Sequence, residues 1–367
     1  MMSAPLIPFA DPGAQVRALR RDIDGAIASV LDAGRYVLGE QVRAFEAEFA
    51  AYLGTAWSAG VGNGTDAIHI ALRALGVGAG DEVIIPSLTA TATGTAVLQC
   101  GATPVFADVD PAFRTIDVAH VARLVTPRTK AIIAVHLYGQ ACDLDALTAL
   151  ADAHKVALVE DCAQAHGARY RGRRVGTFGV LSCFSFYPTK NLGAIGDGGA
   201  VAGSDPALLE RVRLLREYGW SERYHSTHEG WNSRLDELQA AILRVKLRHL
   251  DADNARRRAI AAYYAVQLRG LELGLPTDRP ATEPVYHLYV IESAARDAMA
   301  EQLAAKGIGT LVHYPLGIHQ QQAFARYAPA GGLPVTERLT RSILSLPMFP
   351  QLSQADLDRV CAAVRAA

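Results

Sequence analysis

Apolar residues between Gly60 and about Gly203 form short continuous runs instead of alternating with polar residues. Continuous apolarity at strand length is typical of strands that are covered on both faces, and helix-like stretches lie between the runs. The pattern therefore predicts an α/β fold in which helices flank a largely parallel or mixed sheet. The runs are Asp81–Pro86, Thr103–Asp108, Lys130–His136, Val156–Asp161, Leu181–Tyr187 and Gly199–Ala202.

Helical spacing of apolar residues marks segments between these runs. Such spacing predicts helices over Thr65–Leu75 and Leu144–Leu150. Asp205 followed by Pro206 predicts the start of a helix that runs to about Tyr218. From Leu235 to Leu268 the chain has neither Pro nor Gly, which predicts one long helix bridging to a second domain.

A smaller α/β domain is expected after that helix. The segments His287–Ile291 and Leu311–Tyr314 are strand-like, and a closing helix is expected from about Ser353. A length of 367 residues is consistent with two domains. We expect a large domain over residues 1–245, which includes an amino-terminal helical segment, and a small domain over residues 246–367.

Composition and charge exclude several classes of protein. Half of the residues are apolar and the formal net charge is −1, with no basic stripe for a nucleic acid. The amino terminus lacks a signal-peptide pattern, and no apolar stretch is long enough for a membrane span, so we expect a cytoplasmic protein. The five cysteines are scattered without CxxC pairs, which indicates neither a disulfide framework nor a metal site.

Lys190 is the only charged side chain between Arg174 and Asp197, directly after a strand that should be buried. An ammonium group there is costly unless its pKa falls or the amine is modified, which is the requirement for a Schiff-base lysine. The chain has five lysines in all, so this placement is notable. A lysine that extends from the strand end to solvent is the structural alternative.

Asp161 ends the preceding predicted strand, at the edge where open α/β sheets bind ligands. A carboxylate there can hold a pyridine nitrogen protonated, although Asp161 alone could equally be a metal ligand or a helix cap. Glu160 should point to the opposite face of the sheet, because side chains alternate along a strand.

Gly62-Asn-Gly-Thr65 opens a predicted helix whose first amide groups could hold a phosphate. An ordinary glycine turn with Thr65 as the helix cap is the alternative. An anion cradle, a ring-nitrogen carboxylate and an isolated lysine, all at strand-to-helix junctions, together fit pyridoxal 5′-phosphate (PLP).

Several long motifs resemble the nucleotide-sugar aminotransferases of the DegT/DnrJ/EryC1/StrS family, PLP enzymes of fold type I. The resemblance covers nearly the whole chain. Its motifs are Val61-Gly-Asn-Gly-Thr-Asp-Ala67, His136-Leu-Tyr-Gly-Gln140, Glu160-Asp-Cys-Ala-Gln-Ala-His-Gly167, Phe184–Gly199 and Trp231-Asn-Ser-Arg-Leu-Asp-Glu-Leu-Gln-Ala-Ala241.

The resemblance implies a role for individual residues. Lys190 would bind the cofactor as a Schiff base and shuttle protons, with Asp161 on the ring nitrogen and Gln164 near the ring hydroxyl. The cofactor phosphate would bind to Gly64, Thr65 and Ser185. Asn232 would complete that phosphate site from the neighbouring subunit, which implies a homodimer with shared active sites. The family often stacks an aromatic ring on the cofactor at a position that here aligns with Ala90 or Leu88.

The resemblance also implies the reaction. A related sugar 3-dehydration activity has histidine in place of the lysine, so Lys190 argues against that activity. Glutamate is the expected amino donor and a nucleotide-linked keto-sugar the acceptor. Three motifs look more like the branch that aminates C-3 of dTDP-3-keto-6-deoxyhexoses than like the C-4 branch. They are Tyr187–Gly199, Asn232–Gln239 and Gly309–Pro315.

Candidate sugar contacts are His313, Tyr314, Tyr187, Tyr224 and His225, with a packed pair as the alternative for His313 and Tyr314. His136 and His166 are read as structural histidines, and the direction of Arg35 and Tyr36 stays open.

Three other functions are weighed. They are a C-4 aminotransferase, a PLP-fold sensor or regulatory protein without turnover, and a nicotinamide-dependent oxidoreductase. The last would need a G-x-G-x-x-G turn, which Gly60-Val-Gly-Asn-Gly-Thr65 only approximates.

Overall fold

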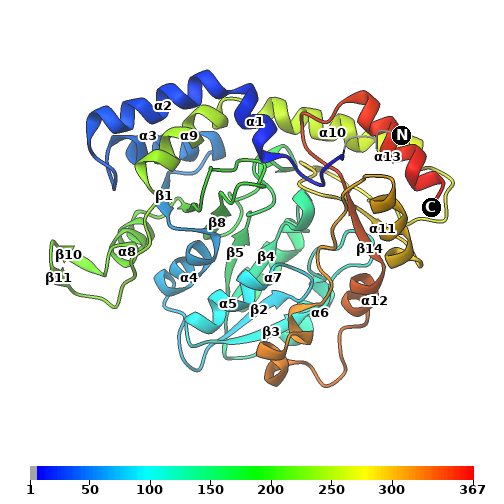
Figure 1. The fold of residues 1–367 in the computed structure, drawn as a ribbon. Coiled ribbons are helices and arrows are strands. Elements are labelled where there is room, and N and C mark those ends of the chain that lie inside the picture. The colour runs from blue at the N-terminus through cyan, green and yellow to red at the C-terminus, as the bar shows by residue number, and fades with distance from the viewer. Residues whose placement is uncertain (1–5) are drawn as a thin grey trace.

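A seven-stranded mixed sheet forms the centre of the molecule (Figure 1). The computed structural model describes residues 6–367, so residues 1–5 of the amino-terminal segment considered above lie outside the described residues. The strand order is β1-β9-β8-β5-β4-β2-β3. Strands from β8 to β3 are parallel, whereas β9 is antiparallel to both β8 and β1. The strands are β1 (Trp57–Val61), β2 (Glu82–Pro86), β3 (Thr103–Ala107), β4 (Thr129–Val135), β5 (Ala157–Asp161), β8 (Leu181–Ser185) and β9 (Gly199–Gly203).

The predicted α/β architecture is confirmed, and both faces of the sheet are covered. Neighbouring residues of β2 show this, because Val83 and Ile85 pack into one core cluster and Ile84 packs into another. Helices α4 (Gly64–Ala74), α5 (Thr91–Gln99) and α8 (Pro206–Arg216) cover one face. The other face is covered by α3 (Glu40–Leu53), α6 (Val118–Leu124), α7 (Leu144–His154) and α9 (Glu237–Leu247). Strand β1 was not among the predicted runs.

The single long helix expected from Leu235 to Leu268 is wrong. The chain forms α9 and then α10 (Leu250–Gln267), with a tight turn in which the His249 N–H donates to the Lys246 carbonyl. Helix α9 packs against α2 (Arg20–Ala33) and α3, whereas α10 packs against α13 (Gln354–Arg365). Tertiary packing therefore breaks a stretch that carries no local breaker.

A smaller lobe at the right of Figure 1 follows α9. Its strands β13 (Tyr289–Glu292) and β14 (Ile343–Leu346) are antiparallel, with α11 (Arg296–Ala305), α12 (Pro334–Ser342) and α13 beside them. The strand expected at Leu311–Tyr314 is reduced to one bridge, between Leu311 and Ser345 of β14. The division after residue 245 falls near the end of α9 and stays a prediction.

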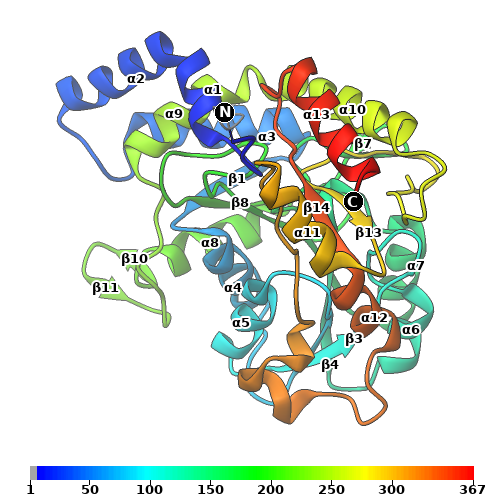
Figure 2. The ribbon, with the colours of Figure 1, turned by 45° about the vertical axis from the view of Figure 1, so that its right-hand side comes forward.

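Two minor sheets complete the fold. The β10–β11 hairpin projects away from the body in both ribbon views (Figures 1 and 2).

No described helix has the length and apolarity that crossing a membrane requires. The remaining elements are α1 (Pro12–Ala18), β6 (Arg169–Tyr170), β7 (Arg173–Arg174), β10 (Trp220–Glu222), β11 (His225–Ser226), β12 (Thr282–Glu283) and the 3₁₀ turns η1 (Leu137–Gly139), η2 (Ile318–Gln320) and η3 (Gln322–Tyr327).

A buried ion pair joins α3, α8 and β1. Arg216 donates to Glu46 at 2.5 Å and to the Gly60 carbonyl at 2.8 Å, and the Gly60 N–H donates to Glu46 at 2.8 Å. Both side chains are less than a tenth exposed. The ion pair and the backbone of β1 therefore supply each other's hydrogen-bond partners.

Replacing Arg216 with Met should lower the free energy of unfolding by about 3–5 kcal/mol, because Glu46 would remain as a buried, uncompensated charge. Denaturant unfolding measures the change. Arg20→Met removes the exposed pair with Asp24 and serves as the matched control, with almost no expected change. Equal effects of the two variants would contradict a structural role for the buried pair.

Candidate active site

A pocket of about 490 Å³ opens where β5 and β8 end and α4 begins. Open α/β sheets bind ligands at this edge. The pocket combines residues from several separate segments of the large domain. Its lining includes Asn63, Gly64, Thr65, Thr89, Ala90, Asp161, Gln164, Ser185, Tyr187, Lys190 and Asp197.

Lys190 lies in the turn after β8, where its N–H donates to the Tyr187 carbonyl at 2.8 Å. The side chain is half-buried. Burial lowers the pKa of Lys190 to about 8, and the nearby Asp161 carboxylate opposes that shift. The amine is therefore poised to gain or lose a proton near neutral pH.

Asp161 is the last residue of β5 and is 5% exposed. Burial raises its pKa, and hydrogen bonds from the Ala163 N–H at 3.1 Å and the Thr93 hydroxyl at 3.0 Å favour the charged form. Thr93 was not predicted as a site residue, because a threonine in a stretch of small residues gives no distinguishing signal. A carboxylate oxygen with a free lone pair can accept a hydrogen bond from a donor group on a ligand.

Glu160 faces away from this pocket, as the alternation along the strand predicts. It accepts three backbone N–H bonds, from Gly176, Phe178 and Gly179, and a bond from His136 at 3.0 Å. The Cys142 N–H donates to Nδ1 of His136, so the ring proton lies on Nε2 and points to Glu160. Cys162 also lies near this pair, but the ring nitrogens of His136 and both oxygens of Glu160 are already engaged in the hydrogen bonds above.

The start of α4 can hold an anion. Asn63 caps the helix by accepting from the Asp66 N–H at 2.9 Å, so the cap is Asn63 and not Thr65. A Cβ on Gly64 would lie 2.6 Å from Cβ of Ser185. Only glycine therefore leaves the helix amides open beside the Ser185 hydroxyl, and this cradle fits a phosphate group.

Gln164 links this pocket to the small lobe. Its side-chain oxygen accepts the Tyr138 N–H at 2.7 Å and its nitrogen donates to the Tyr314 hydroxyl at 3.0 Å. His313 is half-buried and bonds to the Ser345 hydroxyl at 2.9 Å. Tyr187 is 53% exposed at the pocket rim. The structure therefore gathers Gln164, His313 and Tyr314 on one side of the site.

Three predicted site residues lie away from the pocket within one chain. Asn232 is exposed and pairs with Glu217 at the base of the β10–β11 hairpin. Tyr224 and His225 are exposed in the hairpin itself, and Tyr224 lines a separate hollow with Arg35. None of the three is among the residues that line the pocket around Lys190.

The position expected to carry a stacking ring has no aromatic residue. Ala90 lines the pocket together with Thr89, whereas Leu88 is buried in a cluster below it. His166 is fully buried beside Phe184 and Phe186, and its structural role stays a prediction.

Known proteins resemble the chain over its whole length. A model of the DegT/DnrJ/EryC1/StrS aminotransferase family matches residues 17–365. A Streptomyces venezuelae dTDP-3-amino-3,4,6-trideoxy-alpha-D-glucose transaminase is 51% identical over 363 residues, 98% of this chain and 96% of that protein. The erythromycin biosynthesis sensory transduction protein EryC1 of Saccharopolyspora erythraea is 50% identical over 362 residues, 98% of this chain and 99% of that protein.

Among solved structures, DesV of S. venezuelae in complex with a ketimine intermediate has a TM-score of 0.97 and 51% identity. The match covers 99% of this chain and 98% of that chain.

Modification of Lys190 by a small amine-selective reagent such as acetic anhydride should reach half its maximal rate near pH 8, because only the neutral amine reacts. Asp161→Asn should move this midpoint lower, since it removes the carboxylate that raises the pKa of Lys190. Peptide mass spectrometry measures the rate. Asp197→Asn, which changes an exposed lining residue, should leave the midpoint in place. An unmoved midpoint in Asp161→Asn would contradict the electrostatic coupling.

Proposed function

Because the chain belongs to the DegT/DnrJ/EryC1/StrS aminotransferase family, we propose that it aminates C-3 of a dTDP-linked 3-keto-6-deoxyhexose with glutamate as donor. As a family member it is a PLP-dependent sugar aminotransferase. The observation that carries the proposal is the half-buried Lys190 amine of lowered pKa beside the buried Asp161 carboxylate. The C-3 position is supported by the transaminase named above.

The pocket residues fit PLP by their donor types. Amide groups at the start of α4, with Gly64, Thr65 and Ser185, would hold the phosphate. Asp161 would hold a proton on the ring nitrogen, and Gln164 would lie near the ring hydroxyl. When bound, PLP supplies an electron sink for the carbon that loses or gains a proton.

Lys190 is the residue that moves the proton. Its Nζ would take a proton from the donor carbon in the first half-reaction and return one to the sugar carbon in the second. A general base works best when its pKa lies near the working pH, and burial brings Lys190 to about 8. Tyr314 stays a protonated donor, because burial raises its pKa to about 12.

The sugar would enter over the pocket rim, where Tyr187, His313 and Tyr314 are the proposed contacts. Burial lowers the pKa of His313 to about 4, and the charge of Lys190 adds to this shift. The imidazole is therefore neutral, and it can donate or accept a hydrogen bond to a sugar hydroxyl without adding a second positive charge.

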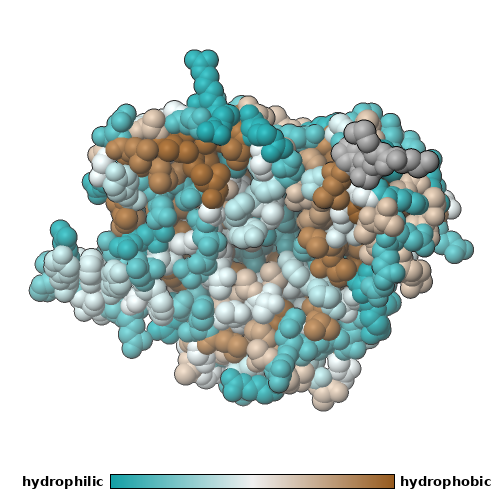
Figure 3. Space-filling view, viewed as in Figure 1, coloured by the Kyte–Doolittle hydropathy of each residue, from teal (hydrophilic) through white to brown (hydrophobic). Residues whose placement is uncertain are grey.

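A homodimer with shared sites is part of the proposal. An apolar patch lies over α2 and the segment after it (Figure 3), where Leu31 and Val37 are 55% and 41% exposed. Tyr224 and His225 lie in the projecting hairpin, and Asn232 lies at its base. All three would reach the pocket of a second copy. A closed two-fold pair buries the patch and completes both sites together. A cytoplasmic location stays a prediction from the sequence.

A non-catalytic regulatory role is the second candidate, and the name of the 50% identical relative favours it. Such a protein would bind PLP without turnover. Lys190, Asp161 and the Gly64 cradle argue for catalysis, since the three together are needed for chemistry. C-4 amination remains the alternative substrate position.

Absorbance of the PLP-loaded protein should test the function directly. The long-wavelength band of lysine-bound cofactor should shift on adding glutamate and return on adding dTDP-3-keto-6-deoxyhexose. Lys190→Ala should lack that band and lose at least about 10³-fold in turnover, because the proton carrier is gone. Lys130→Ala removes an exposed lysine at the start of β4 and should behave as wild type.

Each contrary result has a distinct meaning. A shift without return on the 3-keto-sugar excludes C-3 amination and directs the same measurement to 4-keto-sugars. A band that does not respond to glutamate favours the regulatory reading. An active Lys190→Ala variant refutes the assigned role of the lysine.

Mixing two inactive variants tests the shared sites. Lys190→Ala and Asn232→Ala chains, unfolded together and refolded, should regain about a quarter of the wild-type activity, since half of the random dimers hold one intact site. Each variant refolded alone is the control. No recovery in a sample that contains mixed dimers would place Asn232 outside the site of the partner.

A further inference from the structure

Tyr138 is the residue at which the cofactor pocket and the small lobe meet. It lies in η1, directly after β4, and is 8% exposed. Its φ of 61° is in the left-handed region, which residues with a Cβ rarely adopt. Such a backbone conformation costs free energy, so it persists only where contacts with the surrounding structure hold the residue in place. We therefore infer the role of Tyr138 from the contacts that it makes.

The backbone of Tyr138 orients Gln164. A backbone N–H can only donate, so the amide oxygen of Gln164 must face Tyr138, at 2.7 Å. The amide nitrogen is consequently turned toward the Tyr314 hydroxyl, at 3.0 Å. One hydrogen bond thereby fixes which end of the Gln164 side chain is presented to the pocket.

The side chain of Tyr138 holds the opposite wall. Its hydroxyl donates to the carbonyl oxygen of His313, the residue before Tyr314. Its ring packs in a buried cluster with Leu88 and Leu288. A single residue therefore fixes Gln164 through its backbone and the His313–Tyr314 segment through its phenol.

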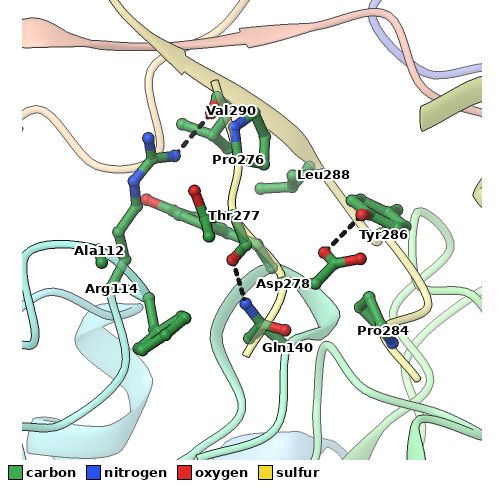
Figure 4. Close-up of a pocket in the computed structure, with 12 residues that line it drawn as sticks. Ala112, Arg114, Gln140, Pro276, Thr277, Asp278, Pro284, Tyr286, Leu288 and Val290 are labelled. Atoms are coloured by element: carbon green, nitrogen blue, oxygen red, sulfur yellow. Dashed lines mark hydrogen bonds between the residues drawn. The ribbon is translucent and has the colours of Figure 1, made fainter. Parts of the chain in front are cut away.

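Tyr138 also lines a cavity of about 30 Å³, whose other lining residues come from both lobes. Figure 4 shows this cavity. The Gln140 side chain donates to the Thr277 carbonyl at 2.7 Å across this cavity, and the Val285 N–H donates to the Gly139 carbonyl at 3.0 Å. These two hydrogen bonds join the segment after Tyr138 to the small lobe.

We propose that Tyr138 is a positioning residue for the sugar half of the reaction. This inference rests on the proposed function, in which the His313–Tyr314 segment contacts the keto-sugar. The hydroxyl of Tyr138 has no hydrogen bond with Lys190, Asp161 or the Gly64 cradle among the described residues. Its loss should therefore affect the sugar and spare the amino donor.

Tyr138→Phe tests this by removing the hydroxyl and keeping the ring. The half-reaction with glutamate should stay within about twofold of wild type, whereas the half-reaction with the 3-keto-sugar should slow by about tenfold or more. The affinity for the dTDP-linked aminosugar product, measured by calorimetry without donor, should fall by a similar factor. Both half-reactions are followed by the absorbance of the bound cofactor.

Tyr286→Phe is the matched control. It removes a hydroxyl that donates to Asp278 at 2.5 Å on the same cavity and that has no link to Gln164 or His313 in the described chain. It should match wild type in all three measurements. Equal losses in both half-reactions of Tyr138→Phe, or values that equal those of Tyr286→Phe, would overturn the proposal. Failure of the wild-type protein to react with the keto-sugar would instead overturn the proposed function.

Discussion

The burial of one carboxylate, Asp161, at the end of a central strand is the constraint on which the site depends. A buried carboxylate is unfavourable unless hydrogen bonds and an opposite charge compensate it. Thr93 from α5, the Ala163 N–H and the Lys190 amine supply that compensation. Two segments that are far from β5 in the sequence, α5 and the turn that holds Lys190, are thus drawn to the end of β5.

The alternation of β5 gives the neighbouring Glu160 the opposite task. It collects the backbone N–H groups of Gly176, Phe178 and Gly179, and so fixes the loop that leads into β8. Strand β8 then delivers Lys190 to the side on which Asp161 lies. One carboxylate therefore stabilises the path of the chain, while its neighbour in the sequence, Asp161, lines the pocket. The two-residue period of the strand separates these roles.

The sequence predicted what depends on local pattern and missed what depends on distant contacts. Apolar runs predicted six strands of the central sheet. Lys190, Asp161 and Gly64 were predicted as site residues from their local sequence, and all three line the pocket. The break between α9 and α10 could not be predicted, since packing on different neighbours causes it. Thr93 and Tyr138 were missed for the same reason, because their partners lie in other segments.

The histidines near Lys190 show how the charge of the site is controlled. Burial lowers the pKa of His166 to about 3, that of His287 well below its usual range and that of His313 to about 4, with the charge of Lys190 contributing to each shift. If these three imidazoles were protonated, they would repel the Lys190 ammonium group. Because they stay neutral, the protonation of Lys190 is set mainly by burial and by Asp161. The amine can therefore gain or lose a proton near neutral pH while these three imidazoles stay neutral.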